Sequence, residues 1–264
     1  MNSNEVKEIV KEKYGEIATK SSSSCGCGCS SNNKIDDYSI MNDEYKNVQG
    51  YVADADLKLG CGMPTEFAAI KEGDTVVDLG SGAGNDVFIA RAITGEKGKV
   101  IGIDFTPEMI EKANRNNQKL NYSNVEFKLG EIEDMPLSEN TADVVVSNCV
   151  LNLVPSKQKA FSEIFRILKP GGHFCVSDIV VKGDLPEDLR KSAEMYAGCI
   201  SGAVGHDEYL EIIKQTGFKN IEIKKTKTLS FPDEVLQKYL SEENITSIEK
   251  NNLGIFSITV YAEK

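Results

Sequence analysis

The chain has 264 residues and a formal net charge of −11, so it can bury a sizeable core in one domain with additions. An acidic surface argues against nucleic acid and anionic membranes as partners, and no apolar run approaches the roughly 20 residues that a membrane span needs. The seven cysteines are an odd number, which favours metal binding or thiol chemistry in a cytoplasmic protein over structural disulfides.

The N-terminal segment, residues 1–34, combines a helix with an unusual cluster of cysteines. Apolar residues between positions 4 and 20 recur at helical spacing and predict one apolar face. A Ser/Gly-rich stretch follows, which is typical of a flexible segment and carries Cys25, Cys27 and Cys29. These thiols fit either a mobile linker or a loading site for a soft ion, because Cys-x-Cys lacks the usual spacing of zinc ligands.

Residues 35–70 predict a lead-in of short helices that carries Cys61. The neighbouring Gly60 and Gly62 are expected to leave the thiol of Cys61 exposed. Since this segment runs directly into the glycine-rich turn described next, we expect Cys61 to lie near the ligand of that turn.

The centre of the sequence is an apolar run containing Asp78, followed by a Gly-x-Gly-x-Gly turn at residues 80–84. A second short apolar run ends at Asp104, where a carboxylate can accept hydrogen bonds from a ribose. The spacing differs from the Gly-x-Gly-x-x-Gly of dinucleotide sites. Asp78 and Asp86, on either side of the turn, would repel a pyrophosphate but suit the sulfonium and amino groups of S-adenosylmethionine.

Strands alternate with helices over residues 71–180, which predicts a parallel, doubly wound core that binds its ligand at the carboxyl ends of the strands. Residues 129–133 and Asn148 follow two of these strands, so Cys149 belongs at the same edge. Residues 181–206 read as a cap inserted over this edge. Residues 207–264 add a helix and two strands, which completes a seven-stranded sheet with an antiparallel last strand.

Several segments together resemble the arsenite S-adenosylmethionine methyltransferases, within the class I methyltransferase superfamily. They are Leu59-Gly-Cys-Gly62, the glycine turn, Gly102 to Ala113, Leu129 to Glu133, Ser147-Asn-Cys-Val-Leu-Asn-Leu153 and Ala197-Gly-Cys199. The resemblance implies an α/β, seven-stranded Rossmann-like fold with an N-terminal helical segment and a cap insertion. It implies methylation of arsenite and then methylarsenite, in arsenic detoxification, by a protein expected to be a monomer.

The resemblance also assigns roles to residues. Cys61, Cys149 and Cys199 are expected to be the catalytic residues that bind trivalent arsenic. One upstream cysteine is expected to act in redox turnover with a thioredoxin- or glutathione-type reductant, and Cys25, Cys27 and Cys29 are equal candidates. The residues expected to bind S-adenosylmethionine are Asp78, Gly80, Ser81, Gly82, Asp104, Phe105, Glu131, Ile132, Glu133 and Asn148.

The residues support this chemistry and leave two alternatives open. Trivalent arsenic is soft, thiolates are soft ligands, and the arsenic lone pair can attack the methyl group of a positioned sulfonium. Cys175, inside a predicted strand, reads as a small buried hydrophobe, and His173 and His206 as structural or surface residues. The alternatives are a methyltransferase of a small organic acceptor, in which the cysteines are incidental, and a non-catalytic metalloid sensor that uses the thiols.

Overall fold

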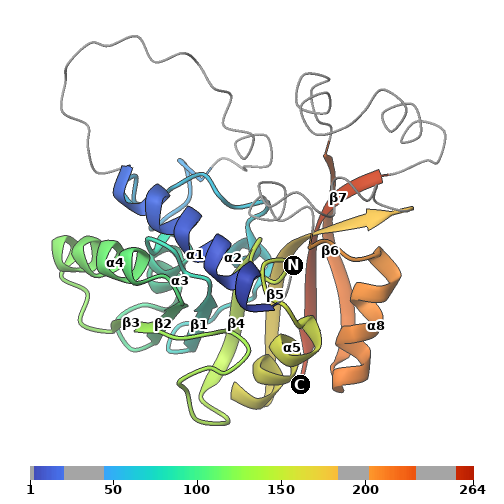
Figure 1. The fold of residues 1–264 in the computed structure, drawn as a ribbon. Helices are drawn as coiled ribbons and strands as arrows, with labels where there is room; N and C mark the ends of the chain where they lie inside the picture. Colours follow the sequence, from blue (N-terminus) through green and yellow to red (C-terminus); the bar gives the residue numbers. More distant parts are fainter. Residues whose placement is uncertain (1–2, 21–44, 184–201, 230–253) are drawn as a thin grey trace.

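The computed structural model describes residues 3–20, 45–183, 202–229 and 254–264. Its centre is one seven-stranded sheet in the order β3-β2-β1-β4-β5-β7-β6 (Figure 1). Five strands are parallel: β1 (Thr75–Leu79), β2 (Lys99–Asp104), β3 (Val125–Leu129), β4 (Ala142–Asn148) and β5 (Leu168–Lys182). The remaining two, β6 (Lys219–Leu229) and β7 (Gly254–Glu263), pair antiparallel. The predicted seven-stranded sheet with an antiparallel last strand is confirmed.

The two faces of the sheet bury two apolar clusters, because successive side chains of a strand point to opposite faces. Val77 and Leu79 pack into a cluster with the inner faces of α5 (Lys157–Ile167) and α8 (His206–Thr216). Val76 and its neighbours pack on the other face against α2 (Pro64–Phe67), α3 (Asn85–Thr94) and α4 (Pro107–Leu120). With both faces covered, the parallel strands read as nearly continuous apolar runs.

The N-terminal helix α1 (Ser3–Lys20) lies alongside α4, near the carboxyl ends of the strands (Figure 1). Its apolar residues Val6 and Val10 are buried, as the helical spacing predicts. None of the helices in the described ranges is long and apolar enough to cross a membrane.

The junction between α5 and β5 is short, and one expectation for the lead-in segment differs from the structure. The strand β5 begins at Leu168 and runs through Pro170-Gly-Gly172. Leu168 is buried and already pairs with Ala142. The helix α5 therefore ends at Ile167, and the chain turns directly into the sheet. In addition, the described part of the lead-in, residues 45–70, contains the single short helix α2 where several short helices were expected.

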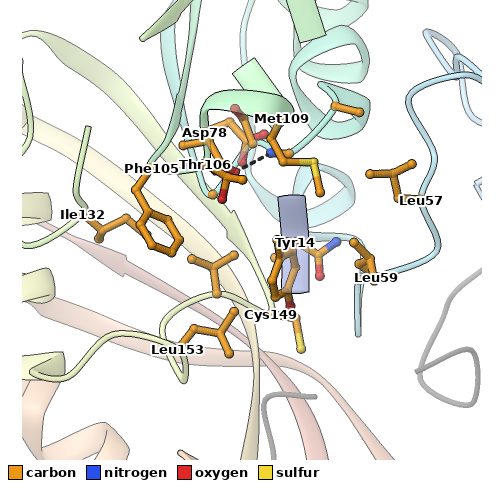
Figure 2. Close-up of a pocket in the computed structure, with 18 of the residues that line it drawn as sticks. Tyr14, Leu57, Leu59, Asp78, Phe105, Thr106, Met109, Ile132, Cys149 and Leu153 are labelled. Carbon is orange, nitrogen blue, oxygen red and sulfur yellow. Dashed lines mark hydrogen bonds between the residues drawn. The ribbon is translucent and has the colours of Figure 1, made fainter. Parts of the chain in front are cut away.

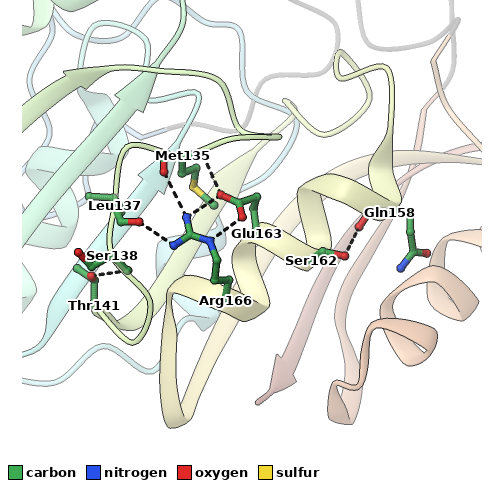
Figure 3. A network of polar contacts seen from close by, with 8 residues as sticks. All are labelled: Met135, Leu137, Ser138, Thr141, Gln158, Ser162, Glu163 and Arg166. Atoms are coloured by element: carbon green, nitrogen blue, oxygen red, sulfur yellow. Dashed lines mark hydrogen bonds and ion pairs between the residues drawn. The ribbon is translucent and has the colours of Figure 1, made fainter.

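A partly exposed ion pair within α5 fixes this helix to the loop between β3 and β4 (Figure 3). Arg166 binds Glu163 through two charged hydrogen bonds of 2.6 and 2.7 Å and also donates to the carbonyl groups of Met135 and Leu137. Glu163 in turn accepts the backbone N–H of Met135 at 2.8 Å. These bonds hold the loop that carries the tip of β3 in place.

Candidate active site

A pocket opens at the carboxyl ends of the parallel strands, where doubly wound sheets bind ligands. Figure 2 shows Asp78, Thr106 and Met109 on one side of it and Cys149 and Leu153 on the other. All ten residues expected to bind the cofactor line this one pocket: Asp78, Gly80, Ser81, Gly82, Asp104, Phe105, Glu131, Ile132, Glu133 and Asn148.

The glycine turn between β1 and α3 forms the floor of the pocket. Gly80 has a φ of +65°, and a Cβ there would lie 2.3 Å from a methyl carbon of Val150, so only glycine fits. The backbone N–H of Ser81 donates to the Ile103 carbonyl at 2.9 Å. The N–H of Gly82 donates to the Asp104 carboxylate, also at 2.9 Å.

Asp104 therefore joins the tip of β2 to the glycine turn. Its second carboxylate oxygen accepts the N–H of Thr106 at 2.8 Å, at the start of α4. Each oxygen retains a further lone pair, and Asp104 lines the pocket, so a ribose hydroxyl could still be accepted.

Three buried acidic side chains, Asp78, Asp86 and Asp104, line the pocket. Burial raises the pKa of Asp78 well above its usual range, and the nearby charges of Asp86 and Asp104 raise it further. Burial raises the pKa of Asp86 to about 6, and it also raises the pKa of Asp104. A positively charged ligand would relieve this crowding of like charges.

The polar and apolar walls also fit the expected cofactor. Within the described part of the chain, the Ser81 hydroxyl and the Asn85 amide oxygen are buried without a hydrogen-bond partner, and both residues line the pocket. Phe105, Ile132 and Met109 supply apolar surface of the kind that stacks against a base. Unpaired buried polar groups beside an apolar wall are typical of a small-molecule pocket, and this combination fits S-adenosylmethionine.

The helix α1 contributes residues that sequence reasoning missed. Lys7, Val10 and Tyr14 line the pocket, although they precede the glycine turn by more than sixty residues. The Lys7 ammonium group lies 2.6 Å from Glu131 and 3.0 Å from Glu133, both at the tip of β3. The sequence predicts the apolar face of this helix, but no nearby residue pattern indicates which surface of the protein that face covers.

Cys149 lies at the tip of β4, as the strand pattern predicts. It lines the pocket and is 2% exposed, with a φ of +59° that is unusual for a residue other than glycine. Its N–H donates to the Ser177 carbonyl at 2.7 Å, which holds this strained turn against β5. Strained backbone held by its surroundings is frequent at functional sites.

The expectation that the Cys61 thiol is exposed is wrong, because this residue is only 1% exposed. The flanking glycines permit close approach: a Cβ at Gly60 would lie 2.6 Å from the Asn148 amide nitrogen, and one at Gly62 would lie 2.5 Å from the Ser177 hydroxyl. Leu59 and Gly60 line the pocket, whereas Cys61 is not among its lining residues. The loop that carries Cys61 therefore reaches the pocket, as expected, but the Cys61 thiol is buried.

A buried pair of polar side chains, Tyr209 and Asp178, was also missed. The Tyr209 hydroxyl donates to Asp178 at 3.2 Å, and burial raises the pKa of Asp178 to about 7. Burial and the neighbouring Asp178 raise the pKa of Tyr209 well above its usual range. The sequence signal that could have indicated this pair is Asp178, an aspartate inside the apolar run of β5.

The remaining cysteine expectations have different outcomes. Cys25, Cys27, Cys29 and Cys199 lie outside the described residues. Cys175 is fully buried within β5, and burial raises the pKa of its thiol to about 12, which agrees with a packing role. Among the described residues, no group of three or more Cys, His, Asp or Glu side chains converges as a metal site.

Comparisons with known proteins agree with this geometry. Residues 70–217 match the family described as "Methyltransferase domain". The chain is 41% identical to the arsenite methyltransferase of Halobacterium salinarum over 83% of this chain and 59% of that protein. The crystal structure of an arsenic(III) S-adenosylmethionine methyltransferase from Chlamydomonas reinhardtii is similar, with 32% identity and a TM-score of 0.65 over 78% of this chain and 67% of that one.

A more distant structure shows the fold alone. The phosphoethanolamine N-methyltransferase 2 of Haemonchus contortus, in complex with S-adenosyl-L-methionine, is 20% identical with a TM-score of 0.60 over 78% of this chain and 53% of that one. The chain spans between 44% and 59% of the length of the curated arsenite methyltransferases it matches. From the family match, the Halobacterium relative and the Chlamydomonas structure, the chain belongs to the arsenite S-adenosylmethionine methyltransferase family.

Proposed function

We propose that the protein methylates trivalent arsenic, first arsenite and then methylarsenite, with S-adenosylmethionine as methyl donor. The observation that carries this proposal is the position of Cys149, whose side chain lies in the wall of the same pocket as the ten residues expected to bind the cofactor. The relatives that match most of the chain are named arsenite methyltransferases, which supports the same reading.

The chain's own residues would bind and orient the reactants. The carboxylates of Asp78, Asp86 and Asp104 favour a cationic donor, and the thiolates of Cys149, Cys61 and Cys199 would hold the soft arsenic ion. Thiolate ligation leaves the arsenic lone pair in place and directs it at the methyl group. When bound, S-adenosylmethionine supplies an electrophilic methyl group and takes the C–S electron pair back onto sulfur. Catalysis is then mostly positioning.

The transfer formally oxidises arsenic, so turnover needs two electrons. Two thiols supply them by closing a disulfide, and an external thioredoxin- or glutathione-type reductant reopens it. We assign one of Cys25, Cys27 and Cys29 to this step, together with Cys61. Thiols in this role require a reducing compartment, and we therefore place the protein in the cytoplasm, acting in arsenic detoxification.

The test replaces single thiols with serine, which is nearly isosteric but a hard ligand. Cys149→Ser and Cys199→Ser should abolish methylation of both arsenite and methylarsenite, measured by separating the arsenic species after incubation with donor and thiol. Cys61→Ser, and a variant with all three early cysteines replaced, should still methylate methylarsenite.

The matched control is Cys175→Ser. It puts a hydroxyl into the core at a fully buried position, which costs about 1–3 kcal/mol of stability, yet it lies outside the pocket. Retained methylation in this variant would show that loss at Cys149 is not loss of folding. If Cys149→Ser methylates methylarsenite at the parent rate, an organic acceptor becomes the better substrate class.

A further inference from the structure

The Asn148 side chain connects the tip of β4 to the backbone of the loop that carries Cys61. Its amide oxygen accepts the N–H groups of Cys61 and Gly62 at 3.0 and 3.3 Å. Its amide nitrogen donates to the Gly62 carbonyl at 2.8 Å. One side chain thus pairs with donors and an acceptor of the loop, which fixes both the position and the orientation of the loop.

Tyr45 completes this network from a different part of the chain. Its hydroxyl donates to the Gly62 carbonyl at 2.7 Å and accepts from the Asn148 amide nitrogen at 2.6 Å. The same amide nitrogen lies 3.1 Å from a carboxylate oxygen of Asp86. Tyr45, Asp86 and Asn148 all line the pocket, so the loop of Cys61 is bonded directly to the pocket wall.

A second contact holds the same loop from the opposite side. The Ser257 hydroxyl on β7 donates to the Cys61 carbonyl at 2.6 Å, and both groups are buried. The glycines on either side of Cys61 allow these approaches, because a Cβ at either would collide with Asn148 or Ser177. Both peptide groups that flank the Cys61 side chain are therefore bonded to the sheet.

The residue that follows Asn148 is Cys149. A side chain next to one proposed arsenic ligand therefore holds the backbone of another. Both segments also meet at Ser177, whose carbonyl accepts the Cys149 N–H at 2.7 Å and whose hydroxyl packs against Gly62. We propose that Asn148 and Tyr45 are positioning residues that set the separation of Cys61 from Cys149, so that both thiolates can ligate one arsenic ion. This inference rests on the proposed function.

The test variant is Tyr45→Phe, which keeps the buried ring and removes the hydroxyl bonded to Gly62 and Asn148. Arsenite uses three thiolates, whereas methylarsenite has a methyl group in place of one of them. We therefore expect the KM for arsenite to rise roughly tenfold, with a much smaller change in the KM for methylarsenite.

A Cys61→Ser background makes the test specific. If Tyr45 acts through Cys61, adding Tyr45→Phe to Cys61→Ser should change the arsenite KM no further. The matched control is Tyr122→Phe, the same chemical change at a tyrosine whose ring contacts Arg91 and Phe88. It should leave the arsenite KM unchanged.

Ser257→Ala provides an independent variant, because it loosens the same loop from β7 and lies outside the pocket. It should also raise the KM for arsenite more than that for methylarsenite, even if Tyr45→Phe fails to fold. An unchanged arsenite KM in a folded Tyr45→Phe or Ser257→Ala, while Cys61→Ser raises it, would overturn this inference alone. Normal arsenite kinetics in Cys149→Ser would instead overturn the proposed function.

Discussion

Asp104 shows how one side chain can serve both the fold and the ligand. Its carboxylate accepts the N–H groups of Gly82 and Thr106, and so fixes the glycine turn relative to α4 while it faces the pocket. The glycine turn and the ribose contact that we expect at this position would therefore be coupled through a single carboxylate.

We expect Asp104→Ala to weaken S-adenosylmethionine binding by about 1–3 kcal/mol, because a charge-assisted hydrogen bond is lost. Arsenite binding should remain nearly unchanged, since the thiols lie at other strand tips. Calorimetric titration of each ligand measures both effects. Asp104→Asn, which keeps one oxygen acceptor, is expected to retain more affinity. Unchanged cofactor affinity in the alanine variant would contradict the assignment.

At the scale of elements, α1 is joined to the pocket by the pairs of Lys7 with Glu131 and Glu133. The Glu133 side chain is nearly buried and also accepts the N–H of Ser156 at 2.9 Å, so the helix is connected through β3 to the start of α5. This arrangement fixes α1 against the pocket, and we therefore infer that the helix helps to hold the cofactor.

Lys7→Met should reduce cofactor affinity roughly fivefold, since each partly exposed pair contributes only about 0.5–1 kcal/mol. The difference from the parent should shrink when salt is raised from about 0.05 M to about 0.5 M, because exposed charges are screened. Fluorescence or calorimetric titrations at the two salt concentrations test this. Lys11→Met, at an exposed position of the same helix, is the control and should bind like the parent.

The ion pair of α5 makes a prediction about stability. The hydrogen bond from Arg166 lowers the pKa of Glu163 below its usual value, so the pair stabilises the fold above the unfolded-state pKa and is lost as the pH falls through the folded-state pKa. Glu163→Gln should therefore cost about 1 kcal/mol near pH 7, after allowance for solvent screening, and little near pH 3. Urea unfolding at the two pH values measures the difference.

The matched control for α5 is Glu211→Gln on α8. Glu211 pairs with Lys214 at 4.0 Å between two well exposed side chains, so its loss should change the free energy of unfolding very little. Equal decreases in the free energy of unfolding in the two variants would contradict this prediction. The contacts to Met135 and Leu137 would then add no stability to the Glu163–Arg166 pair.

Across the whole molecule, the sequence is informative where a pattern is local and uninformative where contacts are distant. The strands and their carboxyl ends follow from runs such as Val76–Leu79, and their parallel order brings the predicted residues to one edge. The burial of Cys61 depends on Asn148, 87 residues away, and the role of Tyr45 on a bond across 103 residues. Contacts between such distant residues leave no periodic pattern in the sequence. Gly60 and Gly62, which permit close packing against Asn148 and Ser177, were therefore interpreted as leaving Cys61 exposed.

The electrostatics of the whole molecule predict how donor binding depends on pH. The chain carries a net charge of −11, and three buried carboxylates in the pocket crowd one another. Burial raises the pKa of Asp86 to about 6, so this group gains a proton as the pH falls below neutral. A sulfonium donor favours the ionised carboxylates, and its binding must therefore release protons in this range.

We expect the affinity for S-adenosylmethionine to fall roughly tenfold between about pH 7 and about pH 5, whereas S-adenosylhomocysteine, which lacks the sulfonium charge, should show a shallower slope. Calorimetry in buffers of different ionisation enthalpy measures the proton release directly. Lys7, Glu131 and Glu133 also face the pocket, so Asp86→Asn is needed to assign the effect, and it should flatten the slope for the sulfonium donor. Equal slopes for the two ligands in the parent protein would contradict the prediction, because the carboxylates would then not respond to the charge that distinguishes substrate from product.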